Sequence, residues 1–121
     1  MENIFTIQQI SKMTGLTVHT LRYYEKVGLL NEVNRDKNGY RQFSEADISW
    51  IHFLIRLRVT GMSVTDMKRF SDLRSQGEST ISARRELLEV HQHKVLEEIK
   101  ALKDNLSEIE KKIDYYKEME E

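Results

Sequence analysis

The C-terminal third of the chain is the part that most restricts how it can fold. After Gly77 there is neither a glycine nor a proline as far as Glu121, and apolar residues recur at alternating spacings of three and four. This spacing predicts a long helix with a single apolar seam, as in a coiled coil. One row of the seam comprises Ile81, Leu88, Val95, Leu102, Ile109 and Tyr116, and the companion row comprises Ile99, Leu106 and Ile113. Arg85 and Gln92 occupy the companion row near its start and make it polar there.

A helix with this pattern needs a partner. At about 1.5 Å per residue it would reach roughly 60 Å, and helices in proteins owe most of their stability to packing of the apolar face. We therefore expect a homodimer. The residues expected at its interface are Leu88, Val95, Ile99, Leu102, Leu106, Ile109, Ile113 and Tyr116.

The N-terminal part predicts two short helices joined by a tight turn. Thr6 and Gln9 have the spacing of a capping box. Residues 14–16 form the turn, in which Gly15 suits the left-handed position, and Thr17 caps the second helix. This is the pattern of a helix-turn-helix, whose second helix enters the major groove of DNA. In a helical protein the same pattern is more often an ordinary helix corner.

The second helix, within residues 17–28, carries the candidate reading face. Neighbouring helical positions lie about 100° apart, so Leu21 and Val27 can face a core while Arg22, flanked by His19, points elsewhere. Leu29 and Leu30 can complete a small hydrophobic core.

A basic hairpin is predicted after this helix. Asn38 and Gly39 are a strong turn signal, because both central positions of a type I′ turn need positive φ. Arg35, Lys37 and Arg41 lie around this turn and can reach phosphates or a minor groove, as the wing of a winged helix-turn-helix does. The alternative is a solvated loop whose charges contact nothing.

Two further helices are predicted before the long one. Ser44 begins the third helix and Gly61 ends it, while Ser63 begins a fourth helix that runs to about Leu73. The residues expected to face inward are Ile48, Trp50, Ile51, Phe53, Leu54, Ile55, Leu57, Val59, Val64, Met67 and Phe70. Residues 75–79 are the expected linker, so we expect a DNA-binding domain over residues 1–74 and a dimerisation helix over residues 75–121.

Charge and composition narrow the function. Residues 1–74 hold 11 basic and 8 acidic side chains, a net +3, whereas residues 75–121 hold 8 and 12, a net −4. The basic half therefore contains the helix-turn-helix. There is no cysteine, no long apolar run and no signal-peptide pattern, so we expect a cytoplasmic protein without disulfides or a membrane span.

The order of these motifs resembles the MerR family of bacterial transcription regulators over nearly the whole length. The residues that carry the resemblance are Thr20, Leu21, Arg22, Tyr23, Tyr24, Glu25, Gly28 and Leu29, then Gly39, Tyr40, Arg41, Phe43 and Asp47, then Gly61. The resemblance implies a winged helix-turn-helix dimer held by an antiparallel coiled coil. Such a dimer would bind an inverted-repeat promoter operator and distort an overlong promoter spacer, so that RNA polymerase can engage.

The resemblance also implies roles for individual residues. Arg22 matches a base-reading arginine, which can fork onto guanine, and Val18 and His19 hold positions that tune sequence preference. The remaining matched positions are Thr17 at a phosphate, Tyr23 and Tyr24 at the DNA backbone, Tyr40 and Arg41 in the wing, and Arg58 near the central phosphates. For either of the two adjacent tyrosines, a packing role in the core is an equal alternative.

The departures from the family concern the effector. Metal-sensing members use cysteines, and in an aldehyde-responsive branch a cysteine lies where this chain has Arg56. His91 and His93 lie about 200° apart on a helix and so do not form a facing metal pair. We expect no metal and no cofactor. A small-molecule effector is left open, and its expected place is the cleft between the third and fourth helices and the start of the long helix.

Three other classes of function are weighed. A coiled-coil interaction protein with a vestigial helix-turn-helix is disfavoured by the retention of Arg22, Tyr40 and Arg41. An enzyme is not expected, because the chain has no phosphate-binding glycine loop, nucleophile motif or metal-spaced cluster. A MerR-like DNA-architectural or excision factor without an effector is the main alternative. The apolar seam from Val95 to Tyr116 favours the regulator, because architectural factors of this kind often lack a long dimerisation helix.

Overall fold

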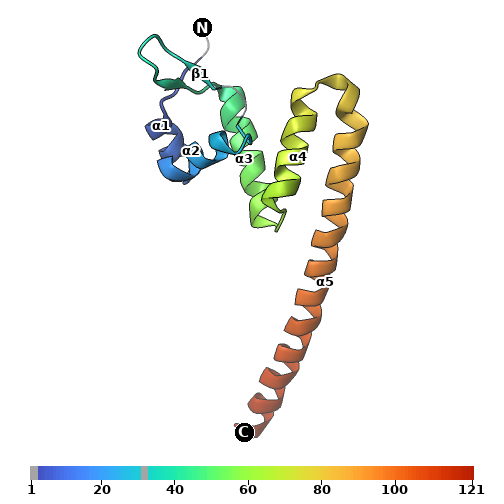
Figure 1. Cartoon of the computed structure of the whole chain (residues 1–121). Coiled ribbons are helices and arrows are strands. Elements are labelled where there is room, and N and C mark those ends of the chain that lie inside the picture. The colour runs from blue at the N-terminus through green and yellow to red at the C-terminus, as the bar shows by residue number, and fades with distance from the viewer. Residues whose placement is uncertain (1–2, 31–32) are drawn as a thin grey trace. The chain divides into compact units, whose positions relative to one another are not determined.

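The computed structural model describes residues 3–30 and 33–121, and within them the chain is mainly helical (Figure 1). Contacts divide it into two compact units, Met1–Arg85 and Glu86–Glu121, and each is described by itself. The elements are α1 (Ile7–Thr14), α2 (Val18–Lys26), β1 (Asn34–Arg35), β2 (Arg41–Gln42), α3 (Glu45–Val59), α4 (Val64–Ser75), the 3-10 turn η1 (Glu78–Thr80) and α5 (Ile81–Met119). The mainly α fold, with a helix-turn-helix and a long C-terminal helix, is the predicted one.

All four predicted N-caps are confirmed. The side chains of Thr6, Thr17, Ser44 and Ser63 each accept a hydrogen bond from the backbone N–H three residues later. At Thr6 and Ser44 the bond is reciprocated, which completes a capping box. These caps explain why each helix begins where the sequence pattern places it, since they satisfy amide groups that a helix start leaves without a partner.

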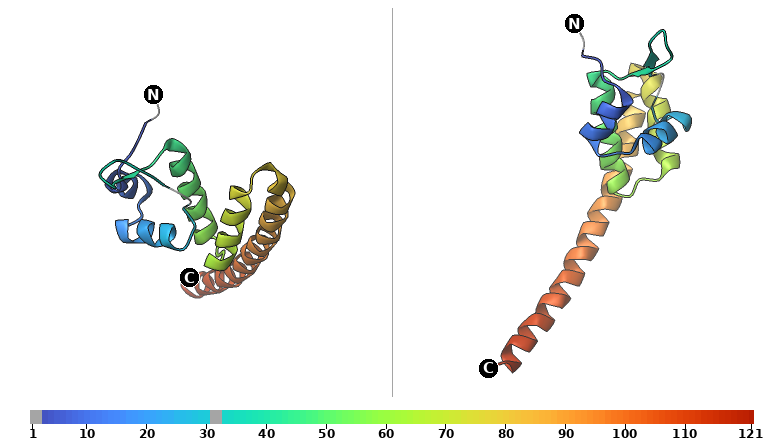
Figure 2. Two further views of the ribbon diagram at one scale, coloured as in Figure 1. Left: turned by 45° about the horizontal axis from the view of Figure 1, so that its top comes forward. Right: turned by 90° about the vertical axis from the view of Figure 1, so that its left-hand side faces the viewer.

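The core of the first unit lies where α1, α2 and α3 meet and continues between α3 and α4, which run side by side in opposite directions (Figures 1 and 2). Trp50 of α3 stacks on Phe70 of α4, with ring centroids 5.7 Å apart. The hydrophobic side chains with almost no exposed surface are Ile10, Leu21, Leu29, Phe43, Ile51, Leu54 and Met67. The helix-turn-helix is therefore supported from behind by α3.

A short antiparallel hairpin follows α2. β1 pairs with β2, and just beyond β2 the buried Phe43 exchanges two backbone hydrogen bonds of 2.8 Å with Phe5. The segment before α1 is thereby joined to the base of the hairpin. The ring of Phe43 is buried, whereas Tyr40 in the loop is exposed.

Four details differ from the prediction. Val59 is exposed rather than buried, because it lies about 200° around the helix from the buried Leu57. Phe53 is exposed as well, since its ring contacts Trp50 and Phe70 on one side only. α4 runs two residues beyond Leu73, to Ser75. Three of the five predicted linker residues are helical, since Ser75 ends α4 and Glu78 and Ser79 lie in η1.

Candidate nucleic-acid interface

One face of α2 is exposed and polar. His19, Arg22, Tyr23 and Lys26 are exposed at helical spacings of three and four, whereas Leu21 and Tyr24 are buried. Val18 is half-buried at the start of the helix. The predicted reading face is therefore one continuous surface.

The two adjacent tyrosines have different environments. The side chain of Tyr23 keeps 41% of its surface exposed, and Tyr24 keeps 7%. Tyr24 thus follows the packing alternative, because its ring lies with Leu21 on the buried side of α2. Tyr23 lies on the exposed face of α2, where the sequence predicts contact with DNA.

The start of α2 is held by its cap. The Thr17 hydroxyl accepts from the backbone N–H of Thr20 at 3.0 Å and donates to the Thr20 hydroxyl at 2.9 Å. Gly15 ends α1 with φ 80°, the predicted left-handed turn. Because the Thr17 hydroxyl is already used within the chain, the backbone amides of the first turn are the donors left for an anion.

The hairpin is present, but its turn is not the predicted type I′. Arg35 pairs with Arg41, and Asp36 and Tyr40 close a three-residue loop through a backbone hydrogen bond of 2.9 Å. The Asp36 carboxylate also accepts from the backbone N–H groups of Asn38 and Tyr40, each at 2.9 Å. Gly39 takes the left-handed position with φ 85°. Capping of the loop by the Asp36 side chain selects this longer turn over the two-residue one.

The basic residues of the hairpin fall into two groups. Lys37 and Tyr40 are exposed at the loop. Arg35 and Arg41 instead pair with Glu25 of α2, at 3.0 Å and 2.6 Å. The hairpin thus lies beside the last turn of α2, as a wing does, and two of its three predicted phosphate ligands have an acidic partner within the chain.

Arg58 lies apart from α2 in sequence, in the last turn of α3, and its side chain is exposed. Two residues of interest were not among the predicted site residues. Lys26 completes the exposed face of α2, and its spacing of four from Arg22 could have identified it. No sequence signal pairs Glu25 with the hairpin, because that contact joins residues 10 and 16 positions apart.

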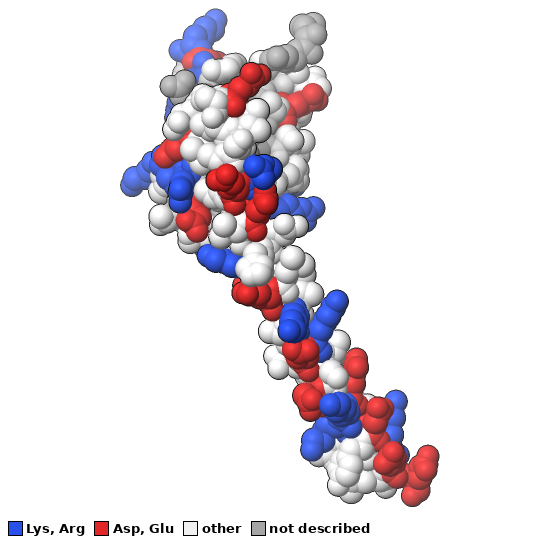
Figure 3. Space-filling model, turned by 90° about the vertical axis from the view of Figure 1, so that its right-hand side faces the viewer, with Lys and Arg blue, Asp and Glu red and all other residues white. Residues whose placement is uncertain are grey.

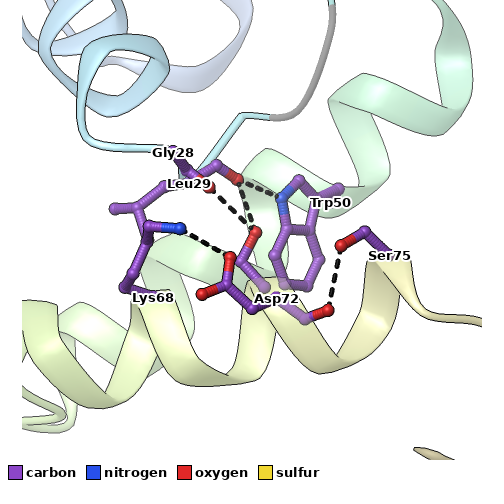
Figure 4. A network of polar contacts seen from close by, with 7 residues as sticks. Gly28, Leu29, Trp50, Lys68, Asp72 and Ser75 are labelled. Atoms are coloured by element: carbon purple, nitrogen blue, oxygen red, sulfur yellow. Dashed lines mark hydrogen bonds and ion pairs between the residues drawn. The ribbon is translucent and has the colours of Figure 1, made fainter.

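The segment after α2 is fixed to α3 and α4 by polar contacts (Figure 4). The Trp50 indole N–H donates to the carbonyl of Leu29 at 2.7 Å. The buried Ser71 hydroxyl lies 3.2 Å from the carbonyl of Gly28 and 3.3 Å from that of Leu29. Lys68, which pairs with Asp72, runs along this segment. These contacts hold the C-terminal end of the reading helix on the rest of the unit.

Gly28→Ala is expected to lower the free energy of unfolding by about 1 to 2 kcal/mol, because Gly28 has φ +87° and a side chain there is strained. An added Cβ would also lie 2.7 Å from Cε of Lys68, whose flexible end must move. Urea denaturation would measure the loss. Gly15→Ala, with φ +80° and nothing within 4 Å of an added Cβ, measures the backbone strain alone, and any larger loss at Gly28 is due to the contact with Lys68. A loss under about 0.5 kcal/mol at Gly28 would contradict the expected strain.

α5 carries the predicted apolar seam mostly on its exposed surface. From Ile99 to Tyr116 every predicted seam residue is exposed, with between 42% and 68% of its surface accessible. Leu88 and Val95 are half-buried. Along the helix, acidic and basic side chains are interspersed with uncharged surface (Figure 3). A helix with a lengthwise apolar row and mixed charges around it is typical of a coiled-coil subunit.

A shallow hollow lies between α3 and α4, part of the place where an effector is expected. It has a volume of about 430 Å³ and is lined by Ala46, Ser49, Trp50 and Phe53 of α3 and by Arg74 of α4. The Arg74 guanidinium lies 4.3 Å from the centre of the Trp50 ring. The start of α5 does not line this hollow. Over residues 3–30 and 33–121, no three histidine or acidic side chains gather in a way that could hold a metal ion.

A helix-turn-helix with a polar, partly basic reading face and a hairpin beside it defines a winged helix-turn-helix protein. Residues 5–73 match the model of the MerR helix-turn-helix family of regulatory proteins. The chain belongs to this family and is a MerR-type transcriptional regulator.

Several relatives share most of the length. An uncharacterised helix-turn-helix regulator of Haemophilus influenzae is 38% identical over 93% of this chain and 83% of its own. The regulator AdhR of Bacillus subtilis is 38% identical over 75% of this chain and 65% of AdhR. These relatives are transcriptional regulators rather than enzymes.

Two solved structures have the same fold over nearly the whole chain. HiNmlR, a MerR family regulator that lacks the sensor domain and was solved bound to promoter DNA, has a TM-score of 0.87 and 36% identity, over 96% of this chain and 92% of its own. A MerR family regulator from Listeria monocytogenes has a TM-score of 0.89 and 32% identity, over 93% of this chain and 85% of its own. In the described part of the chain, no helix combines the length and apolar character needed to cross a membrane.

Proposed function

We propose that the protein acts in the cytoplasm as a homodimer that binds an inverted-repeat promoter operator and controls transcription by distorting the promoter spacer. The observation that carries the proposal is the continuous exposed face of α2, with His19, Arg22, Tyr23 and Lys26 on one side of a helix whose other side is buried. The likeness to HiNmlR, solved on promoter DNA, supports it.

The proposed contacts divide into reading and positioning. Arg22 would fork onto guanine O6 and N7 in the major groove, and His19 and Val18 would tune the preference at neighbouring bases. The amides that follow Thr17 would hold a phosphate at the helix N-terminus, and Tyr23 would meet the backbone nearby. Together these contacts would fix one register of the helix in the groove.

Lys37 at the loop of the hairpin is proposed to contact a phosphate, because its side chain is exposed and extends from the wing. Lys37→Ala should weaken binding equally on all duplexes. The slope of log K against log salt should become shallower by about one unit per protomer, as each lost phosphate contact releases one counterion fewer. Fluorescence anisotropy at several salt concentrations measures this slope. Lys117→Ala on α5, outside the proposed interface, is the control, and an equal change in both variants would contradict the contact.

The proposed dimer forms through α5. Its seam residues from Ile99 to Tyr116 are exposed in the single chain, and pairing two such helices would remove both apolar rows from water. The family resemblance favours the antiparallel arrangement. A two-fold dimer would present two α2 helices to successive turns of the duplex, and so requires an operator with matching symmetry.

The proposed output is a change in DNA shape. Contacts of the dimer with both half-sites would offset the free energy of bending and untwisting the spacer, after which RNA polymerase could engage the promoter. The proposal places a small-molecule effector, where one acts, in the hollow beside Trp50. The 39-residue α5 favours this function over that of an architectural factor without a dimerisation helix.

Selection of DNA from a random duplex library by the purified full chain tests the proposal. We expect the selected sites to contain an inverted repeat whose half-sites are separated by a whole number of helical turns, about 34 to 36 Å each. Circular permutation of a selected site should reveal bending. Enrichment of no sequence, or of sites without two-fold symmetry, would overturn the proposed function.

A further inference from the structure

One carboxylate connects the reading helix to both strands of the hairpin. Glu25 lies in the last turn of α2, and its Oε1 is 3.0 Å from Nη2 of Arg35 in β1. Its Oε2 is 2.6 Å from Nε of Arg41 in β2. Because Arg35 and Arg41 are directly paired across the hairpin, their side chains leave the same face of it. That face is the one toward α2.

The hairpin needs an anchor of this kind. Each strand has only two residues, and an isolated two-stranded hairpin is marginal in water. Nη1 of Arg35 also donates to the carbonyl of Gly39 at 2.9 Å, so the same guanidinium joins the loop to α2. Backbone pairing with Phe5 holds only the base of the hairpin, beyond β2.

The ion pairs are partly shielded from solvent. The side chains of Glu25 and Arg41 keep 23% and 20% of their surface exposed, while Arg35 keeps 45%. Salt screens partly buried pairs less than exposed ones, and charge-assisted hydrogen bonds of this length are comparatively strong. The contact between Arg41 and Glu25 is therefore the firmer of the two.

We propose that Glu25 is a positioning residue, which fixes the wing relative to the reading helix and so contributes to operator specificity without touching a base. The inference rests on the proposed function. With Glu25 in place, the exposed face of α2 and the loop around Lys37 approach a duplex in one fixed relation. Without it, the wing must be ordered when the protein takes up its specific register on the operator, and this cost in free energy weakens binding there, whereas looser binding to unrelated DNA does not require an ordered wing.

A simple charge effect makes the opposite prediction. A carboxylate near the phosphate backbone repels it, so its removal should tighten binding to every duplex. A positioning role predicts that the operator is favoured less over unrelated DNA after the same removal, although the protein has become more positive. The direction in which operator preference changes therefore distinguishes a positioning role from a simple charge effect.

The test compares the full-length wild type with Glu25→Gln and Glu25→Asp. Anisotropy would measure binding to a duplex that the wild type selects and to a scrambled duplex of equal length. We expect the ratio of the two affinities to fall about tenfold for Glu25→Gln, the size of one or two side chains newly ordered on binding. For Glu25→Asp, whose side chain is one methylene shorter, this ratio should lie between the values of the wild type and of Glu25→Gln. The control is Glu78→Gln, which removes the same charge in η1 and should leave the ratio unchanged.

A second measurement needs no DNA. In the free protein, heteronuclear NOE values for the amides of residues 35–41 should drop in Glu25→Gln, while those of α3 stay as in the wild type. An unchanged ratio, tighter binding to both duplexes or unchanged NOE values in Glu25→Gln would overturn the positioning role. A wild type that favours no duplex would instead count against the proposed function, and the NOE comparison would still judge the attachment of the wing.

Discussion

Leu102→Asp is expected to convert the protein from a dimer to a monomer. Leu102 lies in the middle of the α5 seam with 68% of its surface exposed in the single chain. Burial of a leucine contributes about 1.5 to 3 kcal/mol, and a dimer contains the residue twice, so loss of both should raise the dissociation constant about a thousandfold. The buried carboxylates would add a further penalty. The affinity for the operator should fall as the dimer dissociates, because one molecule no longer binds both half-sites.

Sedimentation equilibrium at micromolar concentrations measures this effect. Ala101→Asp is the matched control, since it introduces the same charge at the neighbouring position, which lies off the seam and is exposed. The control should remain dimeric. If Leu102→Asp dimerises as the wild type does, the seam assignment is wrong.

Arg22→Ala is expected to cost about 1 to 3 kcal/mol at the operator, or roughly 5- to 150-fold in affinity, and to relax the preference at one base pair. The reason is that Arg22 lies in the middle of the exposed face of α2, where a guanidinium can reach base edges. Competition binding against operators substituted one base pair at a time would locate the relaxed position.

Lys26→Ala is the control for the loss of charge. Lys26 lies one turn further along the same face, and we expect its removal to weaken binding to all duplexes alike. A base-reading role for Arg22 would be refuted if Arg22→Ala produced the same uniform loss with every preference intact.

Local chemistry accounts for the parts of the fold that could be predicted. Thr6, Thr17, Ser44 and Ser63 cap the helices because a hydroxyl three residues before an amide suits a helix start wherever it occurs. Apolar spacing similarly revealed the buried face of α3 and the seam of α5. These signals act over a few residues, so they can be recognised without knowledge of what packs nearby.

Two predictions that were wrong concern the type of the hairpin turn and the burial of Val59. Asn38 and Gly39 suggested a two-residue turn, but the Asp36 side chain accepts two backbone amides and lengthens the loop by one residue. Val59 continues the apolar spacing of α3, but its position on the helix faces solvent rather than the core. In both cases the local pattern allowed more than one structure.

The sequence by itself determined where α1 to α4 begin, which face of α2 is exposed and polar, and where the apolar row of α5 lies, since each depends on spacing and capping within one segment. Only the tertiary structure decided that Tyr24 packs inward, that Trp50 and Ser71 hold the end of α2, and that Glu25 takes both wing arginines. The physical reason is that these contacts join residues distant in the chain, and their partners are selected by how the elements pack rather than by any periodicity.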